Sequence, residues 1–332
     1  METLSNERRN TTMSRVPYPN LICPGATKAA TTTLFFILNS HPDIYGSPHK
    51  ELHVFSVNKR FENYESWFVK FYNTYNNERY ILDASQDYLP QKHIPRRIAD
   101  TLGLDLKFIC VLRNPVSRAV SHYLHMKTRN KGELRDVPES LLPKDYENMD
   151  LDALLDFERE NTISLNETGG LNIIDTDWEE LHLPYCYFHY SAYARQIKNY
   201  FNVFPKENFL FLTFEDVTHN QQYVKKNISE FLDIDPNLFK AIDQLWENPT
   251  VAHKKSYPFF TKFKQPLKPL IPKSLYPALK KVEGMLFTTP IKPVSFSTDT
   301  RDNLVKIFLP DIQETESLTG LDLSNWKKTN TR

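Results

Sequence analysis

The stretch Leu21-Ile-Cys-Pro-Gly-Ala-Thr-Lys28-Ala-Ala-Thr-Thr-Thr-Leu34 decides the predicted fold of this chain. Its apolar start, Leu21 to Cys23, is typical of a buried strand, which Pro24 and Gly25 end. A helical pattern of apolar residues begins at Leu34. A strand, a loop of small residues and a helix N-terminus together form an anion site, because free backbone N–H groups and the positive end of the helix dipole face the ligand.

The residues of this loop favour the binding of a phosphate-like group. Lys28 adds a full positive charge, and two threonines add hydroxyl donors. The loop has the general design of a P-loop but lacks the Gly-Lys-Ser/Thr ending of the Walker A motif. An ordinary strand-to-helix turn with a surface lysine is the alternative interpretation. We expect the following residues to bind this phosphate-bearing ligand: Gly25, Ala26, Thr27, Lys28, Ala29, Ala30, Thr31 and Thr32.

A second motif, Arg113-Asn-Pro-Val-Ser-Arg118-Ala-Val-Ser121, follows the apolar run 106–112. Its asparagine suits a helix cap, and its proline suits the first helical position. Arg118 and Ser121 are three residues apart and therefore share a helix face, and Arg113 can reach the same space from the strand end. Arginine forks with a hydroxyl suit a terminal phosphate. A capped surface helix with routine arginines is the alternative.

The order of the predicted elements indicates an α/β fold with a central, mostly parallel sheet flanked by helices. Apolar strands alternate with helical patterns, which requires a sheet covered on both faces. Ligands of such sheets bind at the carboxyl ends of the strands, where Lys28 and Arg113 both lie. We expect one domain over 18–328, preceded by a disordered lead, 1–17. The predicted strands are 21–23, 43–46, 80–83, 106–112 and 209–214, and the later helices are 190–204, 217–232 and 236–246.

The two motifs resemble those of sulfotransferases that use 3′-phosphoadenosine 5′-phosphosulfate (PAPS). A lysine followed by a small residue and two Ser/Thr resembles their 5′-phosphosulfate loop, with Ala30 where the family usually has glycine. The stretch from Arg113 to Ser121 resembles their 3′-phosphate motif, Arg-Asn/Asp-Pro-x-x-Arg-x-x-Ser. The resemblance runs from about residue 19 to 328 and is closest to the heparan-sulfate type and its bacterial relatives. It implies a P-loop sulfotransferase-like fold and transfer of a sulfuryl group from PAPS to a hydroxyl or amine.

Transfer also requires a base and a charge at the leaving phosphate. From the residues alone, Glu51, His53, His49 and Asp83 are candidates for the base. Lys50-Glu51-Leu-His53-Val-Phe55 resembles the heparan-sulfate-type segment Lys-Glu-x-His-Phe-Phe, which implies that Glu51 is the base and His53 assists. Lys28 can neutralise the leaving phosphate oxygen, so that no metal is required.

The chain departs from the family pattern at two positions near this segment. The family often has an aspartate after the second Phe, where this chain has Ser56, so an orienting carboxylate is missing or comes from elsewhere. Asp83 begins Asp-Ala-Ser-Gln-Asp-Tyr88, where the family has a Glu-x-x-Pro-x-Tyr turn. Its shorter side chain leaves the role of Asp83 open.

Two segments of biased charge accompany the motifs. Residues 131–182 form an acidic insertion with fifteen Asp or Glu against four Lys or Arg. If it borders the acceptor cleft, it disfavours a polyanionic acceptor; the alternative is a solvated surface. Residues 252–298 are rich in lysine and proline, and we expect a cover over the nucleotide with Lys254 and Lys255 near its phosphates. The alternative for this segment is contact with an anionic membrane.

The overall composition restricts the partners and the compartment. Lys+Arg and Asp+Glu are both 41, whereas a free-standing nucleic-acid binder is more often basic. Cys23, Cys110 and Cys186 are far apart, which indicates buried thiols in a reducing compartment. The polar start has no apolar signal region, and no apolar run is long enough to span a membrane. We expect a cytoplasmic enzyme with a small-molecule or saccharide acceptor, no nucleic-acid partner and no transmembrane segment, compatible with a homo-oligomer.

Two other functions remain alternatives to a sulfotransferase. A P-loop kinase or NTPase needs a Gly-Lys-Ser/Thr ending and a strand that closes in a Mg²⁺-binding aspartate, but the central strand here ends at Arg113. A nucleotide-binding module without catalysis is the second alternative. The presence of both Lys28 and Glu51 argues against it.

Overall fold

The computed structural model describes residues 17–128, 144–146, 148–149, 151–165, 171–173, 187–241, 251–253, 288–290 and 298–328. Several predictions fall outside these ranges: nearly all of the lead 1–17, most of the acidic insertion, most of the cover segment with Lys254 and Lys255, and Cys186. Those predictions remain as they stand.

The described core is a five-stranded parallel sheet in the order β2-β3-β1-β4-β7. The strands are β1 (Leu21–Ile22), β2 (Ile44–Gly46), β3 (Tyr80–Asp83), β4 (Lys107–Leu112) and β7 (Phe209–Thr213). The chain leaves β1 toward β2 on one side and later crosses to β4 on the other side. Strand order therefore reverses at β1, and this is the point where open α/β sheets bind ligands.

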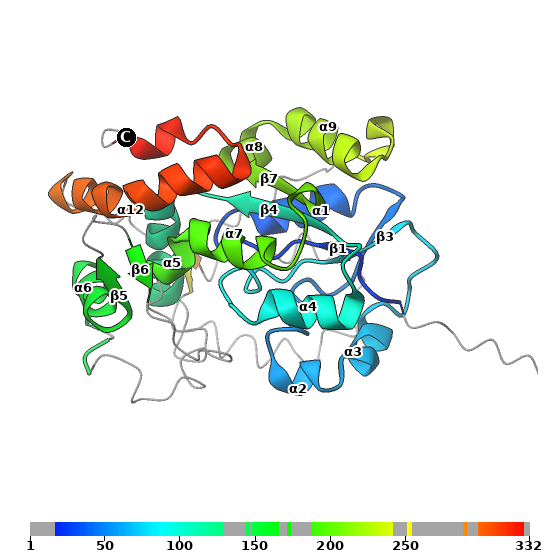
Figure 1. Ribbon diagram of the computed structural model, residues 1–332, viewed down its shortest axis with the longest axis horizontal. Helices are drawn as coiled ribbons and strands as arrows, with labels where there is room; N and C mark the ends of the chain where they lie inside the picture. Colours follow the sequence, from blue (N-terminus) through cyan, green and yellow to red (C-terminus); the bar gives the residue numbers. More distant parts are fainter. Residues whose placement is uncertain are drawn as a thin grey trace, which may run out of the picture.

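Helices cover both faces of the sheet, as predicted. The crossovers β1→β2 and β3→β4 run in opposite directions along the sheet, and right-handed connections therefore put their helices on opposite faces. One face carries α1 (Thr31–Leu38), α8 (Phe214–His219) and α9 (Gln221–Leu232), as Figure 1 shows. The other carries α2 (Asn58–Phe61), α3 (Tyr64–Phe71), α4 (Ile94–Leu102) and α7 (Tyr193–Phe201).

Beyond the carboxyl edge of the sheet lie α5 (Pro115–Thr128), α6 (Leu151–Thr162) and the long α12 (Thr298–Thr319). In Figure 1, α12 runs along α7, and it also contacts α5. Two small antiparallel pairs complete the described strands, β5 (Ile163–Leu165) with β6 (Leu171–Ile173) and β8 (Val251–His253) with β9 (Thr288–Pro290). β8 lies against α5. The short 3₁₀ turns are His189–Ser191, Lys206–Asn208, Pro236–Leu238 and Ser324–Lys327.

The hydrophobic core is centred on β4. From Phe108 to Leu112 this strand is at most 1 % exposed, because helices cover both of its faces. Cys23 and Cys110 are free, buried thiols, as predicted.

The observed helices differ from the predicted ones at some of their bounds. The predicted helix 217–232 is two helices, because the Asn220 side chain accepts a hydrogen bond from the backbone N–H of Tyr223 and caps α9 separately. The predicted helix 190–204 is a 3₁₀ turn followed by α7. The long helix α12 ends at Thr319, because Gly320 has a φ of 72° and a 3₁₀ turn follows.

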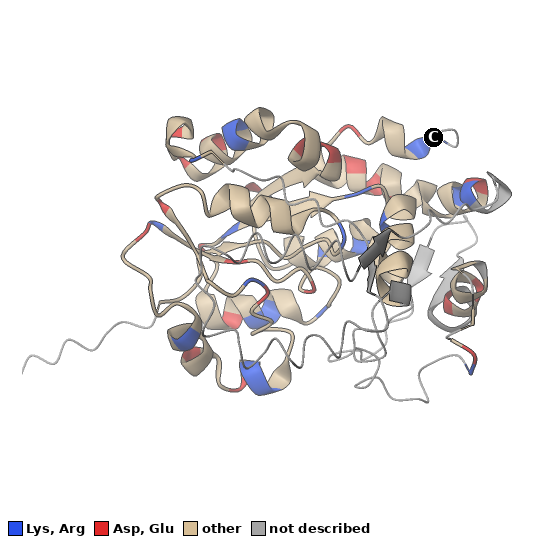
Figure 2. Cartoon of the chain, turned by 180° about the vertical axis from the view of Figure 1, so that it is seen from behind, with Lys and Arg blue, Asp and Glu red and all other residues tan. Residues whose placement is uncertain are grey.

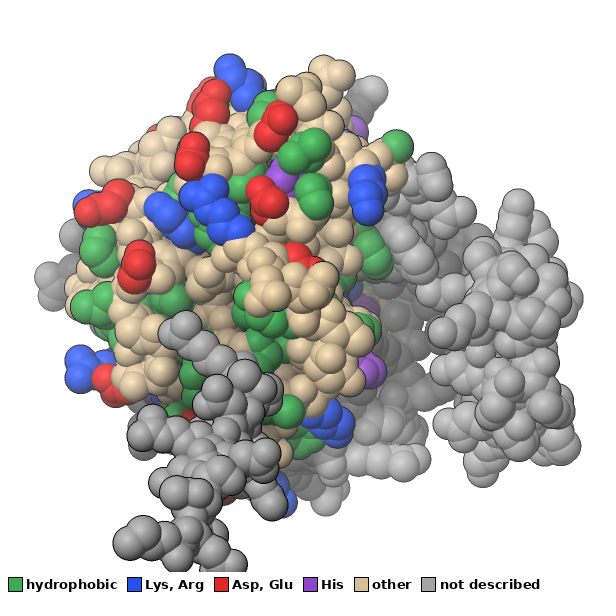
Figure 3. Space-filling model, turned by 90° about the vertical axis from the view of Figure 1, so that its right-hand side faces the viewer, with side chains coloured by type: hydrophobic (Ala, Val, Ile, Leu, Met, Phe, Trp, Pro, Cys, Tyr) green, Lys and Arg blue, Asp and Glu red, His purple; other side chains and the backbone are tan. Residues whose placement is uncertain are grey.

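The surface of the described part carries charges of both signs. In Figure 2, Lys and Arg are interspersed with Asp and Glu along the helices. Figure 3 views the side from which the chain enters β1, and there apolar side chains alternate with charged ones.

Candidate active site

The loop after β1 is pressed against its neighbours at the carboxyl edge of the sheet. The backbone N–H of Ala26 donates to the carbonyl of Val111 at 2.7 Å, and the N–H of Val111 donates to the carbonyl of Gly25 at 2.9 Å. Gly25 has a φ of 151°, and a Cβ there would stand 2.9 Å from the carbonyl oxygen of Gln86. Only glycine allows this close approach.

The end of the loop has the backbone form of an anion site. Lys28 and Ala30 have φ values of 67° and 64°, in the left-handed region. Ala30 directly precedes α1, which has no side-chain cap and no acidic residue in its first turn. The first N–H groups of α1 are therefore not satisfied by a cap and point toward a ligand position. Ala30 adopts the conformation for which the family's usual glycine is suited.

Two threonines of the loop fasten it to the turn that follows β3. Thr27 Oγ1 donates to the carbonyl of Gln86 at 3.1 Å, and Thr31 Oγ1 donates to Gln86 Oε1 at 3.2 Å. Thr31 is buried, whereas Thr32 is half-buried. The structure thus gives two of the predicted loop hydroxyls a partner within the protein.

Arg113 and Lys28 come together at the edge of the sheet, as predicted. Arg113 Nη1 donates to the carbonyl of Lys28 at 2.9 Å, and the guanidinium lies 4.1 Å from the ring centroid of Phe214. The hydroxyl of Tyr193 donates to the carbonyl of Arg113 at 2.9 Å and fixes the strand end. Burial lowers the pKa of Arg113 from its ordinary value.

Arg118, which shares the predicted helix face with Ser121, is bonded inside the protein. It is fully buried and donates to Ser191 Oγ at 2.5 Å and to the carbonyl of Tyr187 at 2.7 Å. Its guanidinium holds the segment before α7 against α5. Ser121, on the same helix, is half-buried.

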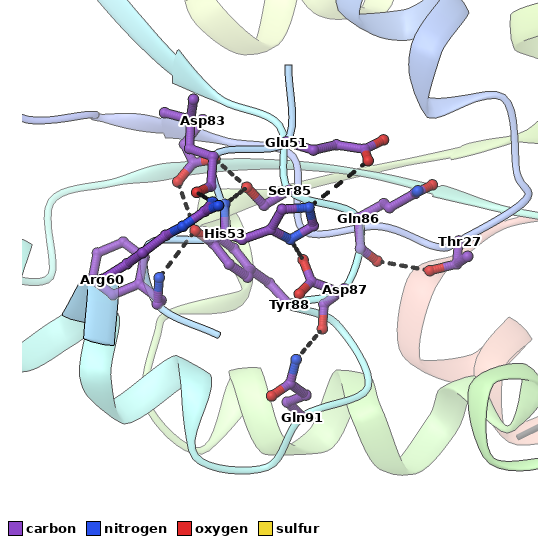
Figure 4. A network of polar contacts seen from close by, with 12 residues as sticks. Thr27, Glu51, His53, Arg60, Asp83, Ser85, Gln86, Asp87, Tyr88 and Gln91 are labelled. Atoms are coloured by element: carbon purple, nitrogen blue, oxygen red, sulfur yellow. Dashed lines mark hydrogen bonds and ion pairs between the residues drawn. The ribbon is translucent and has the colours of Figure 1, made fainter. Parts of the chain in front are cut away.

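The predicted catalytic segment lies between β2 and α2, and Figure 4 shows its side chains. Lys50 Nζ is 2.6 Å from Glu51 Oε1, and His53 Nε2 is 3.9 Å from Glu51 Oε2. The side chains of Glu51 and His53 are 31 % and 25 % exposed, so a substrate can reach them. Both residues have positive φ, 65° and 52°. Such strain costs about 1–3 kcal/mol per residue and collects at functional sites.

The orienting carboxylate that the sequence left open is Asp87. Its Oδ1 lies 2.8 Å from His53 Nδ1, and its side chain is 2 % exposed (Figure 4). Burial alone would lower the pKa of His53, but the hydrogen bond with Asp87 and the charges of Asp87, Glu51 and Asp83 raise it above its ordinary value. A signal was present in the sequence, because Asp87 stands in the turn after β3, at the edge where Lys28 lies.

Asp83 is removed from the candidates for the base, whereas His49 is exposed and stays among them. Asp83 is fully buried and accepts hydrogen bonds from Ser85 Oγ at 2.7 Å and from the Tyr88 hydroxyl at 2.9 Å. Burial raises the pKa of Asp83 to about 6. The His49 ring packs against Phe71, with 5.7 Å between the centroids. Asp83 therefore shapes the turn after β3, while Glu51 and His53 remain exposed to a substrate.

Within the described ranges, no three His, Cys, Asp or Glu side chains gather as a metal site would require. No helix among the described residues is both long and apolar enough to cross a bilayer.

Comparison with known proteins bears on the family and the fold of this chain. Residues 19–274 match the family model of the sulfotransferase domain. The chain is 26 % identical over 298 residues to the membrane-associated sulfotransferase kil1 of Dictyostelium discoideum, over 72 % of this chain and 62 % of that protein. It is 24 % identical over 219 residues to heparan sulfate glucosamine 3-O-sulfotransferase 6 of Homo sapiens, over 65 % of this chain and 53 % of that protein. The matches thus cover less than two thirds of either relative.

A solved structure has the same fold. The sulfotransferase from Alicyclobacillus acidocaldarius superposes with a TM-score of 0.60 at 23 % identity and covers 94 % of this chain and 100 % of that chain. The fold predicted from the sequence is therefore confirmed. Since the family model spans most of the length, from before β1 to beyond β8, this chain belongs to the sulfotransferase family.

Proposed function

We propose that the protein transfers a sulfuryl group from PAPS to a hydroxyl or amine of a small-molecule or saccharide acceptor. The observation that carries the proposal is the meeting of Lys28 and Arg113 at the strand-order reversal, together with an accessible Glu51 near His53. The two cations suit the two phosphate groups of the donor, and the carboxylate suits the acceptor's proton.

The donor fits the residues present at the edge of the sheet. The loop from Gly25 to Thr32 offers the uncapped N-terminus of α1 and the Lys28 ammonium to the 5′-phosphosulfate. Arg113 and Ser121 are assigned to the 3′-phosphate. When bound, PAPS would supply a sulfuryl group on its 5′-phosphate.

The chain's own residues have two tasks in the transfer. Glu51 takes the proton of the acceptor hydroxyl or amine as the new bond to sulfur forms. Lys28 neutralises the charge that develops on the 5′-phosphate oxygen as the old sulfur–oxygen bond breaks. A positioned base contributes about 10²–10⁴-fold to such a rate. His53 is the competing base, because its side chain is also 25 % exposed.

The segment after β8 is assigned to the donor site. β8 lies against α5, the helix of Ser121, and ends at His253. The next residues are Lys254 and Lys255, which we propose as further phosphate ligands in a cover over the nucleotide.

The acceptor and the compartment complete the proposal. The names of several relatives refer to heparan sulfate, which favours a saccharide. The acidic insertion favours a neutral or cationic acceptor. A cytoplasmic location, based on cysteine usage, also remains a prediction, which cell fractionation can test.

The donor assignment is tested by calorimetry with 3′,5′-ADP. Arg113→Ala should bind at least about tenfold more weakly, because losing a hydrogen bond to a charged group costs about 1.5–3 kcal/mol. Arg96→Ala, which removes an exposed arginine paired with Asp100 on α4, is the matched control. Equal affinity of wild type and Arg113→Ala would contradict the assignment.

Activity itself is tested by a screen of acceptors with sulfur-labelled PAPS in the presence of EDTA. Cationic and neutral alcohols are compared with sulfated oligosaccharides at low salt, where electrostatic selection is least screened. Transfer of the label to an acceptor is the expected result. A strict magnesium requirement would favour the kinase alternative instead, and tight 3′,5′-ADP binding without any transfer would favour the non-catalytic module.

A further inference from the structure

We propose that Asp87 is a positioning residue of the reaction, which fixes the ring of His53 and through it the carboxylate of Glu51. The inference rests on the proposed function, since it concerns the base of the same reaction. Asp87 comes from the turn after β3, a different element from the segment that carries Glu51 and His53. In the family pattern its position requires no particular residue.

The geometry forms a chain of three side chains. Asp87 Oδ1 is 2.8 Å from His53 Nδ1, and the opposite ring nitrogen, Nε2, is 3.9 Å from Glu51 Oε2. In Figure 4 the imidazole lies between the two carboxyl groups. The buried end of this chain is Asp87, and the accessible end is Glu51. A change at Asp87 therefore reaches Glu51 through His53.

The backbone of His53 is held from the same turn. Its N–H donates to Ser85 Oγ at 3.0 Å, and Ser85 Oγ in turn donates to Asp83 Oδ1. Arg60 Nη1 donates to the carbonyl of Leu52, the residue between Glu51 and His53. These contacts fix the main chain of the segment. The hydrogen bond with Asp87 is made by the ring itself and acts on its orientation.

An ionised Asp87 can only accept a hydrogen bond, so His53 must carry a proton on Nδ1. In the imidazolium form, Nε2–H then points at Glu51 Oε2 and orients that carboxylate. The groups that face this ring favour the imidazolium. They are the carboxyl groups of Asp87, Glu51 and Asp83, with Lys50 paired to the far oxygen of Glu51.

Asp87 and its neighbour Asp83 have separate tasks. Asp83 accepts bonds from Ser85 and Tyr88 inside its own turn, and it is fully buried. Asp87 reaches out of the turn to a partially exposed ring. A purely structural role would leave the titration of His53 irrelevant to the rate. A positioning role makes the rate depend on the protonation state of His53.

The first experiment compares Asp87→Asn with wild type in steady-state transfer across pH. Asparagine keeps the shape but removes the charge. We expect kcat to fall at least about tenfold while KM for PAPS and the affinity for 3′,5′-ADP stay within about twofold. The alkaline limb of the kcat profile, which reports loss of the imidazolium, should move to lower pH. An unchanged kcat and an unchanged profile would overturn the proposal.

The matched control is Asp43→Asn. Asp43 Oδ2 faces His41 Nδ1 at 4.0 Å, so the same chemical change is made in a second Asp–His pair outside the catalytic segment. We expect no change in kcat or in the pH profile. An effect equal to that of Asp87→Asn would show a general response to lost charge and would overturn the proposal.

A double-mutant cycle tests whether Asp87 acts through His53. In a His53→Gln background, Asp87→Asn should lower kcat by less than about twofold, because the ring that it orients is absent. A full additional loss would overturn the positioning role.

Histidine NMR needs neither a variant nor an acceptor. With ¹⁵N-labelled histidine, neutral His53 in the wild type should carry its proton on Nδ1, and its pKa should lie above that of an exposed histidine. A proton on Nε2 would overturn the proposal even if Asp87→Asn fails to fold. A wild type that transfers to no acceptor would count against the proposed function and leave this measurement decisive for Asp87.

Discussion

Two groups of charged side chains differ in their exposure to solvent. The catalytic group, Glu51, His53 and Asp87, runs from a buried end to an accessible one. The scaffold group, Arg118, Glu158 and Asp311, is buried throughout, and each member is bonded to backbone. Both groups join segments far apart in the sequence. They differ in whether a charge is left where a substrate can reach it.

The scaffold group surrounds one short segment, 187–194. Glu158 on α6 accepts hydrogen bonds from the backbone N–H groups of residues 187–189, and Asp311 on α12 accepts from Tyr193 and Ala194. Arg118 on α5 donates to the carbonyl of Tyr187. Tyr193 then bonds to the carbonyl of Arg113. The scaffold group therefore holds the segment whose Tyr193 contacts the end of β4 at Arg113.

The largest effect is expected at the accessible end of the catalytic group. Glu51→Gln should lower kcat by about 10²–10⁴-fold, because the amide cannot accept the acceptor's proton. Affinity for 3′,5′-ADP and the unfolding midpoint should stay close to wild type, since Glu51 is partially exposed. Activity within a few-fold of wild type would transfer the role of base to His53.

The reverse pattern is expected for the scaffold group. Arg118→Ala should lower the free energy of unfolding by about 3–5 kcal/mol, because it leaves buried polar groups and a buried charge without their partner. Urea denaturation measures this loss. Arg113→Ala is the comparison, with weaker 3′,5′-ADP binding and less than about 1 kcal/mol lost in stability. Equal losses of stability in Arg118→Ala and Arg113→Ala would contradict the expected difference between the buried scaffold group and the residues proposed to bind the donor.

The scaffold group should also make stability depend on pH. Burial raises the pKa of Glu158 from 4.5 to about 7, despite hydrogen bonds from backbone N–H groups. A raised folded pKa means that the folded state binds the proton more tightly than the unfolded state. Stability is therefore full below pH 4.5 and decreases up to about pH 7, by about 2 kcal/mol between pH 5 and 8.

Urea melts of wild type and Glu158→Gln at pH 5, 6.5 and 8 measure this dependence. Glutamine keeps an acceptor oxygen but does not titrate, so wild type should lose stability relative to the variant as pH rises. Asp311, whose pKa burial raises to about 7, contributes in the same direction to both proteins. A difference that is constant with pH would contradict the prediction.

The smallest effect concerns the donor loop. Ala30→Gly should raise the free energy of unfolding by up to about 1 kcal/mol, because glycine adopts the left-handed conformation without the clash of a Cβ. Affinity for 3′,5′-ADP should be equal or higher. Ala29→Gly is the control, since Ala29 is buried and has no positive φ, and it should be destabilising. Destabilisation by Ala30→Gly would show that its methyl group packs favourably.

Local patterns in the sequence were enough to predict the sheet and the loop proposed to bind the donor. Apolar runs marked β3 and β4 to within one residue. Lys28 and Arg113 could be brought together because both follow parallel strands, whose carboxyl ends share one edge. Glu51 and His53 were found through a resemblance, and the structure leaves both accessible.

The remaining features depend on contacts that no local pattern contains. Arg118 and Ser121 fit one helix face, yet Arg118 is directed inward because the carbonyl of Tyr187, 69 residues away, is there to accept it. Asp87 was missed because its partner is 34 residues earlier. The helix boundary at Asn220 was missed because helical periodicity continues through a cap.

Gln86 has a consequence for how such an enzyme can be altered. Its carbonyl and its side-chain oxygen hold Thr27 and Thr31 of the donor loop, and the next residue is Asp87. Gln86 thus ties the donor loop to the turn behind the proposed base, as does the N–H of Leu89, which donates to the carbonyl of Pro24. Loop grafting that exchanges the turn for new acceptor preference would shift the donor loop too. An engineered chimera needs both segments from one parent, with its crossover points placed outside 24–31 and 83–91.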